Sequence, residues 1–231
     1  MPLILLPGLL NTSRLWADQV KTLGKDREVA VCRTDHIGSI SGLAEAVLAM
    51  TVAPTRFALA GLSMGGYVAL EVWRQAPERV AKLALVDTSA RPDTQEQSTR
   101  RRRMMDQAKA EGIAPIVLQQ IPGYLAPRHV NDKRLTGIVA EMAHEVGVNG
   151  FLTQQQAILR RPDSRPDLDS IRCPTVVVVG ADDQLTPVAL AEEIADGISD
   201  AELVSIPDAG HLSPLENPEA VTAGLEEWLR D

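Results

Sequence analysis

Short apolar runs recur along the chain, and each ends near a glycine, an aspartate or a serine. Their hydrophobicity is continuous rather than alternating, which is typical of strands buried on both faces by helices. The runs lie at residues 2–8, 28–35, 56–63, 82–89, 175–182 and 201–210. This pattern predicts an α/β fold with about six strands, most of them parallel.

Stretches with helical spacing follow several of these runs. They lie at residues 41–50, 64–76, 187–198 and 217–229. Pro187 and Pro218 fall near the starts of the last two stretches, where the missing N–H of proline costs nothing. Strand-like and helical stretches therefore alternate, as expected when helices flank a parallel sheet on each side.

A long interval between the fourth and fifth runs breaks this alternation. From about Arg91 to Pro166 the chain has no strand-like run, only helical patterns punctuated by prolines. A structureless loop of roughly 75 residues is improbable inside a folded domain. We therefore expect a helical cap at residues 91–166, inserted into a core formed by residues 1–90 and 167–231.

Composition and charge limit the class of protein and the partners that we expect. The 231 residues are 45% hydrophobic and 23% charged, which is ordinary for a soluble globular protein. A formal charge of −8 argues against a nucleic-acid partner. The opening MPLILLPGLL is too short an apolar run for a signal peptide or a membrane span, so we expect a cytoplasmic protein that does not bind membranes. Two plainly placed cysteines predict neither a disulfide nor a metal site.

The third run ends in LAGLSMGG, which contains a G-x-S-x-G pattern centred on Ser63. A tight turn from strand to helix needs nearly side-chain-free neighbours, and Gly61 and Gly65 meet that need. The turn would raise the Ser63 hydroxyl into the cleft at the carboxyl ends of the strands. The helix that follows would supply backbone N–H groups for a developing negative charge.

A serine hydroxyl needs a base to activate it and an acid to orient that base. His211 follows the last run, so a loop at the carboxyl end of the sheet carries it. For the acid, Asp183 follows the fifth run in GADDQLTP, and its neighbour Asp182 is expected to bond backbone in the turn. Asp87, at the end of the fourth run, is the alternative acid because it lies at the same sheet edge.

The chain order Ser63, Asp183, His211, each after a predicted strand, resembles the α/β-hydrolase superfamily over nearly the whole chain. The resemblance implies an oxyanion hole formed by the backbone N–H groups of Leu9 and Met64. Pro7 stands where the superfamily often has histidine, so the Leu9 loop must be held in another way, for example by proline rigidity. The chain also opens in what looks like the superfamily's third strand, so we expect only parallel strands.

Within the superfamily, GLSMGG and AGHLSPLENPEAV are similar to compact bacterial esterases, enol-lactonases and non-haem perhydrolases. That similarity implies hydrolysis of a small ester, lactone or thioester through an acyl-enzyme on Ser63, without a metal or other cofactor. Ser63 argues against related dehalogenases and epoxide hydrolases, which use aspartate at this position. A triad-dependent lyase of the menaquinone-pathway type and a non-catalytic binding protein stay open as alternatives, and so does assembly into a homo-oligomer.

The charge of the predicted cap differs from that of the rest of the chain. Residues 91–165 contain 12 Lys and Arg against 8 Asp and Glu, so this segment carries about +4 and the remainder about −12. A basic lid could attract anionic substrates. For the run Arg100–Arg103 a solvated helix face is the favoured interpretation, because consecutive helical residues point in different directions. Apolar cap residues that could line a pocket, although packing is the simpler role, are Ile121, Tyr124, Leu125, Phe151 and Leu152.

Overall fold

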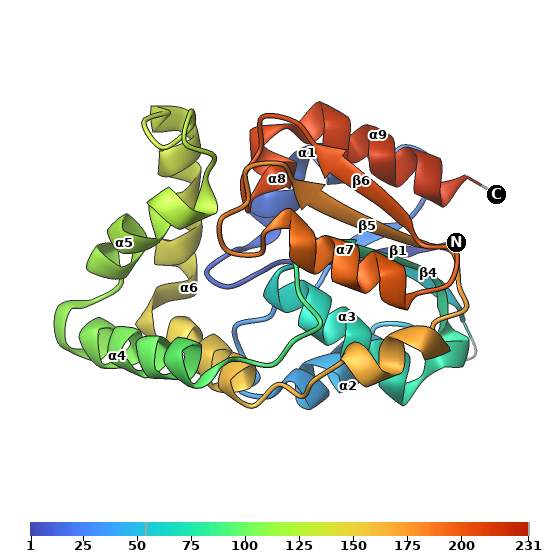
Figure 1. Cartoon of the computed structure of the whole chain (residues 1–231), viewed down its shortest axis with the longest axis horizontal. Coiled ribbons are helices and arrows are strands. Elements are labelled where there is room, and N and C mark those ends of the chain that lie inside the picture. Colours follow the sequence, from blue (N-terminus) through green and yellow to red (C-terminus); the bar gives the residue numbers. More distant parts are fainter. Residues whose placement is uncertain (54, 231) are drawn as a thin grey trace.

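A six-stranded parallel sheet forms the middle layer of the computed structural model, which describes residues 1–53 and 55–230 (Figure 1). The strands are β1 (Leu3–Leu6), β2 (Val29–Val31), β3 (Phe57–Leu62), β4 (Val80–Val86), β5 (Thr175–Gly180) and β6 (Glu202–Ile206). Their order is β2-β1-β3-β4-β5-β6, and every neighbouring pair is parallel. The expectation of about six parallel strands is therefore confirmed.

Burial along the strands follows their place in the sheet. All residues of β1, β3 and β5 are buried, as the continuous apolar runs predicted. The edge strand β2 has only half-buried residues. The other edge strand, β6, is mostly exposed, and its Glu202 and Ser205 face solvent. Polar residues on an edge strand discourage pairing with another chain.

Helices cover both faces of the sheet (Figure 1). One side has α1 (Ala17–Leu23), α8 (Ser213–Glu216) and α9 (Pro218–Leu229), and the other has α2 (Ile40–Ala49), α3 (Met64–Gln75) and α7 (Val188–Gly197). The sequence pattern missed α1 and α8, because helices of seven and four residues are too short for a clear hydrophobic period. Short 3₁₀ helices lie at Ser13–Trp16, Pro77–Arg79 and Arg165–Ser170.

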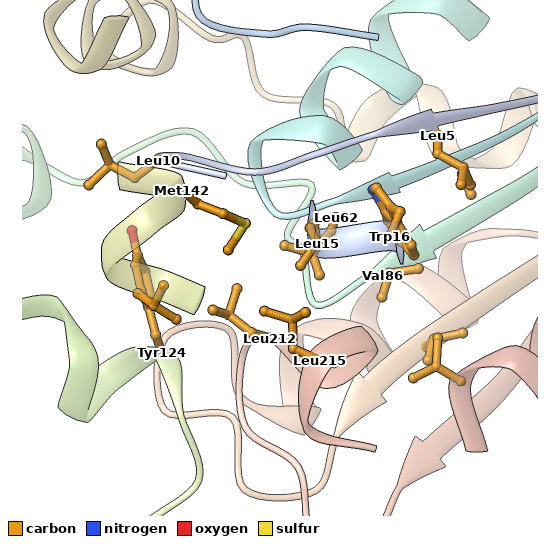
Figure 2. Close-up of a cluster of buried hydrophobic side chains, with 14 of the residues drawn as sticks. Leu5, Leu10, Leu15, Trp16, Leu62, Val86, Tyr124, Met142, Leu212 and Leu215 are labelled. Atoms are coloured by element: carbon orange, nitrogen blue, oxygen red, sulfur yellow. The ribbon is translucent and has the colours of Figure 1, made fainter. Parts of the chain in front are cut away.

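Each helical layer has its own buried cluster. Figure 2 shows the first, in which Leu15 and Trp16 lie between side chains of the central strands and those of Leu212 and Leu215. Tyr124 and Met142 extend the same cluster into the helices inserted after β4. Since one cluster spans both parts, the insertion is packed firmly on the sheet.

Three helices stand beside the carboxyl ends of the strands, between β4 and β5 (Figure 1, green to yellow). They are α4 (Gln95–Glu111), α5 (Ala114–Tyr124) and α6 (Lys133–Leu159), and they confirm the predicted helical insertion. Gly147, at φ 64°, kinks α6. No helix in the described part of the chain, α6 included, has the length and hydrophobicity needed to cross a membrane.

Candidate active site

Ser63 occupies the sharp turn between β3 and α3, with φ 52° and ψ −114°. This backbone conformation is strained for a residue with a side chain. A Cβ at Gly61 would lie 2.2 Å from the Gly65 carbonyl oxygen, and one at Gly65 would lie 2.3 Å from that of Leu6. The turn is fixed from β4, because the Ser63 N–H donates to the Val86 carbonyl at 3.0 Å. The close packing explains why both neighbours are glycine.

His211 joins Ser63 and Asp183 in one chain of contacts. Its Nε2 lies 2.9 Å from Ser63 Oγ, and its Nδ1 lies 2.8 Å from Asp183 Oδ2. His211 and Asp183 are each 3% exposed, so water hardly competes for these contacts. Burial lowers the pKa of His211, but the attraction of Asp183 outweighs it and leaves the pKa raised. The structure thus brings together the three residues that the sequence grouped by their order.

The Asp183 carboxylate is held by several donors besides His211. Oδ1 accepts hydrogen bonds from the backbone N–H groups of Leu185 and Thr186 at 2.8 and 2.9 Å. The Thr186 hydroxyl donates to Oδ2 at 2.6 Å. Burial raises the pKa of Asp183, but His211 and these donors outweigh it and hold the pKa below its usual value. The sequence reasoning missed Thr186, although an Asp-x-x-Thr spacing is typical of such a side-chain-to-backbone turn.

Asp87 lies at the same sheet edge with different partners. Its Oδ1 accepts a hydrogen bond from the Gly180 N–H at 2.7 Å, and its Oδ2 lies 2.5 Å from the Ser213 hydroxyl. Complete burial, together with the charge of Asp183, raises the pKa of Asp87 to about 8. Asp87 therefore links the end of β5 to the segment after His211 as a mainly neutral carboxyl at pH 7. Among the described residues, the carboxyl that contacts the His211 ring is that of Asp183.

The loop after β1 carries the predicted oxyanion donor Leu9. The N–H groups of Leu9 and Met64 donate no hydrogen bond to any acceptor in residues 1–53 and 55–230, and Leu9 lines the cavity described below. Both residues adjoin the β1–β3 boundary, where the strand order reverses from β2-β1 to β3-β4. A reversal of this kind is the usual ligand crevice of an open parallel sheet.

Gln154 of α6 holds the loop that carries Leu9. Its Oε1 accepts the Leu10 N–H at 3.0 Å, and its Nε2 donates to the Thr34 hydroxyl at 3.1 Å. The Gln154 side chain is fully buried. Proline rigidity alone was thus an incomplete expectation, since a side chain from the insertion braces the loop. No sequence pattern pointed to Gln154, because the contact joins positions 144 residues apart.

A second buried side chain, Glu216, ties the His211 segment to the insertion. Its Oε1 accepts the Gly210 N–H at 2.8 Å, and its Oε2 accepts the Ala126 N–H at 2.7 Å. The same Oε2 lies 2.9 Å from Nδ1 of His129. His129 is therefore placed away from Ser63, on a brace between the two segments.

A cavity of about 220 Å³ opens above these groups. Ser63, His211 and Leu9 line its base, and Tyr124 lies over His211 with ring centroids 6.0 Å apart and planes 18° apart. Of the apolar cap residues considered from the sequence, Tyr124 lines this cavity and the other four pack in the first buried cluster. Within the described ranges, no group of three or more His, Cys, Asp and Glu side chains is arranged to hold a metal ion.

Comparisons with known proteins agree with this geometry. The profile of the Alpha/beta hydrolase family matches residues 3–224. The chain belongs to that family. The same fold, with 31% identity and a TM-score of 0.90, occurs in a thermophilic esterase from Thermogutta terrifontis solved with malate bound, and the match covers 100% of this chain and 89% of that one.

Two further relatives of this α/β hydrolase are named for different activities. The enol-lactonase from Burkholderia xenovorans LB400 is 26% identical with a TM-score of 0.90, covering 100% of this chain and 92% of that chain. BpoC of Mycobacterium tuberculosis H37Rv, provisionally named as a non-heme bromoperoxidase, is 30% identical over 206 residues. That match covers 82% of this chain and 73% of BpoC. The predicted resemblance to esterases, enol-lactonases and non-haem perhydrolases is therefore confirmed.

Proposed function

We propose that this α/β hydrolase cleaves small carboxylic esters or lactones through an acyl-enzyme on Ser63. The observation that supports the proposal best is the continuous contact from Ser63 Oγ through His211 to Asp183, at 2.9 and 2.8 Å. A hydroxyl within hydrogen-bond reach of an oriented imidazole is the arrangement that nucleophilic catalysis requires. Thioesters have the same reactive carbonyl and belong to the same class.

The proposed reaction assigns one role to each group around Ser63. His211 Nε2 takes the proton of Ser63 Oγ as that oxygen attacks the substrate carbonyl carbon. The N–H groups of Leu9 and Met64 stabilise the tetrahedral oxyanion, and the imidazolium then protonates the departing alkoxide. A water molecule, deprotonated by His211, attacks the acyl-enzyme and releases the acid. Asp183 keeps Nδ1–H of His211 oriented throughout, and the route needs no metal or organic cofactor.

The cavity favours a short acyl chain. At about 220 Å³ it is smaller than the roughly 300–1,000 Å³ of sites for drug-sized ligands. The buried ring of Tyr124 closes the side over His211. We expect activity with p-nitrophenyl esters to fall as the acyl chain lengthens beyond what this volume holds.

Replacing the nucleophile tests the proposal directly. Ser63→Ala should lower kcat on p-nitrophenyl acetate by about 10⁴-fold or more, since in residues 1–53 and 55–230 the hydroxyl against His211 Nε2 is that of Ser63. Ser89→Ala is a matched control, because Ser89 lines the same cavity and its hydroxyl accepts a hydrogen bond from the Arg91 N–H rather than contacting His211. The control should keep turnover within a few-fold.

Covalent labelling separates this proposal from the alternatives. A fluorophosphonate probe should label the wild type and Ser89→Ala but not Ser63→Ala. Labelling of Ser63 without turnover of any ester, lactone or thioester, together with carbon–carbon cleavage of a pathway substrate, would favour a triad-dependent lyase. Absence of labelling would favour a non-catalytic binding protein.

A further inference from the structure

One wall of the cavity is strongly basic. Arg91, Arg100, Arg101 and Arg161 line it, and the lining contains no aspartate or glutamate. The cavity wall is thus charged on one side only, at the end built by the insertion. An apolar acyl chain would gain nothing from four guanidinium groups, whereas a negatively charged one would.

Arg101 and Arg161 are held in place by one buried carboxylate. Asp93, whose side chain is 3% exposed, accepts from Arg101 Nε at 2.7 Å and from Arg161 Nη1 at 2.6 Å. The side chain of Arg161 is only 5% exposed. Two cations that share one anion leave a net positive charge in a poorly solvated place, where charge interactions are strong.

Arg161 lines the same cavity as Ser63 and has one guanidinium nitrogen without a partner in the described part of the chain. Its guanidinium lies over the ring of Tyr67 at 4.3 Å, and Tyr67 is one helical turn after Ser63. Its Nε donates to the Arg91 carbonyl, and its Nη1 donates to Asp93 and to the Ile158 carbonyl. Across residues 1–53 and 55–230, no hydrogen bond is formed by Nη2. Its two N–H bonds can therefore donate to a ligand carboxylate in the cavity that Arg161 lines.

The other charged side chains at this wall also leave an excess of positive charge. Arg91 is paired with Glu193 at 2.9 Å, whereas Arg100 has no ion pair with any described carboxylate. Four arginines against the carboxylates of Asp93 and Glu193 leave 4 − 2 = +2 at this wall. A carboxylate of a ligand would neutralise part of this positive charge. It would also accept hydrogen bonds from guanidinium N–H groups that have no partner in the described part of the chain.

The arginine run Arg100–Arg103 divides into two functional halves. Arg100 and Arg101 line the cavity, while Arg102 and Arg103 are exposed and outside it. Arg100, Arg102 and Arg103 are exposed, as the solvated-face interpretation expects, but Arg100 also borders the cavity and Arg101 is half-buried in its wall. The two halves also form a natural experimental pair, because they lie on the same helix with the same chemistry.

We propose that Arg100, Arg101 and Arg161 form a carboxylate subsite for the substrate end remote from the scissile carbonyl, so that preferred substrates are monoesters of short dicarboxylic acids. This subsite rests on the proposed ester hydrolysis and specifies its substrate class. Guanidinium forks match the planar carboxylate in a bidentate way. The hydrocarbon spacer between the two carboxyl groups would then lie between the arginine wall and Ser63.

Matched esters test the charge and nothing else. Monomethyl adipate and methyl hexanoate have acyl chains of equal length, and only the first ends in a carboxylate. Methanol release should give the wild type a kcat/KM about tenfold or more higher for monomethyl adipate, and added salt should reduce that ratio. Equal kcat/KM values for the two esters would overturn the subsite.

Two variants and one control test which arginines cause the preference for the acidic ester. Arg100→Gln and Arg161→Gln should each lower the ratio of the two kcat/KM values several-fold, chiefly through KM for the acidic ester. Arg102→Gln should leave the ratio unchanged. If Arg161→Gln fails to fold because Asp93 loses a partner, exposed Arg100 still decides the question. A ratio that falls equally in Arg100→Gln and Arg102→Gln would contradict the proposal.

Calorimetry with adipate separates this subsite from the catalytic proposal. Adipate should bind the wild type and bind Arg100→Gln several-fold more weakly. Hydrolysis of both esters without adipate binding would remove the subsite and leave the ester hydrolase. Adipate binding without hydrolysis of either ester would remove the ester hydrolase and leave an anion site.

Discussion

The carboxyl edge of the sheet and the helical insertion meet at one cavity, but they hold their polar groups differently. At the sheet edge, Ser63 and Asp183 are fixed largely by backbone N–H and C=O groups next to strand ends. In the insertion, Arg101 and Arg161 are fixed by another side chain, Asp93. Backbone contacts survive most substitutions, whereas ion pairs between side chains change with single residues. The reacting groups are thus built into the fold, and the groups expected to select the substrate are replaceable.

The largest effect should distinguish the two buried aspartates of the sheet edge. Asp183→Asn should lower kcat by about 10³–10⁴-fold, because the amide oxygen would keep the Leu185 and Thr186 N–H groups and the NH2 group would then face His211 Nδ1, which favours the wrong tautomer. Asp87→Asn is the matched control, and its kcat should stay within about tenfold, since Asp87 contacts Gly180 and Ser213 instead. Steady-state rates on one p-nitrophenyl ester measure both. Equal losses would mean that Asp87 shares the role of the acid.

A substitution in the insertion should lower kcat by a smaller factor. That result would show that the insertion also helps to hold the catalytic groups at the sheet edge. Gln154→Ala leaves the Leu10 N–H without its partner, so the loop that carries Leu9 should loosen. We expect kcat to fall by about tenfold, less than the loss of a whole oxyanion donor, with KM changed little. Gln156→Ala is the control, because Gln156 is exposed on the same helix. A change in KM alone would contradict a role in positioning the oxyanion loop.

The last effect concerns stability rather than turnover, and it involves Asp87. Its pKa is about 8 in the folded chain and 3.8 when unperturbed, so the unfolded chain ionises first as pH rises. The contribution of Asp87 to the free energy of unfolding should therefore fall between those pH values. Relative to the wild type, Asp87→Asn should therefore become progressively more stable as pH rises through that window. Urea unfolding at several pH values measures this, and parallel curves for both proteins would contradict the neutral carboxyl.

Much of the sheet edge could be predicted because its signals are local. Continuous apolar runs mark buried strands, and G-x-S-x-G marks a turn that must bring Gly61 against Gly65. Ser63, Asp183 and His211 each follow a strand. They are therefore expected at the same edge of the sheet, because parallel strands all end there. The same rule could not rank Asp183 above Asp87 by itself. The ranking in the structure depends on the path of the loop that carries His211.

Contacts of the insertion could not be predicted, because they join distant parts of the chain. Gln154 reaches Leu10 across 144 residues, and Arg161 reaches Asp93 across 68. Helical periodicity indicates which residues share a face, but not which loop that face will meet. The kink at Gly147 adds a change of direction that periodicity does not encode.

Local hydrophobicity and turn geometry specify the succession of the six strands along the chain, the helices long enough to show a period, the place of the insertion and the candidate residues for the chemistry. Only the tertiary structure decided which aspartate meets His211, what holds the loop of Leu9, and which arginines of the run Arg100–Arg103 face the cavity. The physical reason is that long-range packing fixes the relative placement of elements, and a side chain acquires its partners only after that placement.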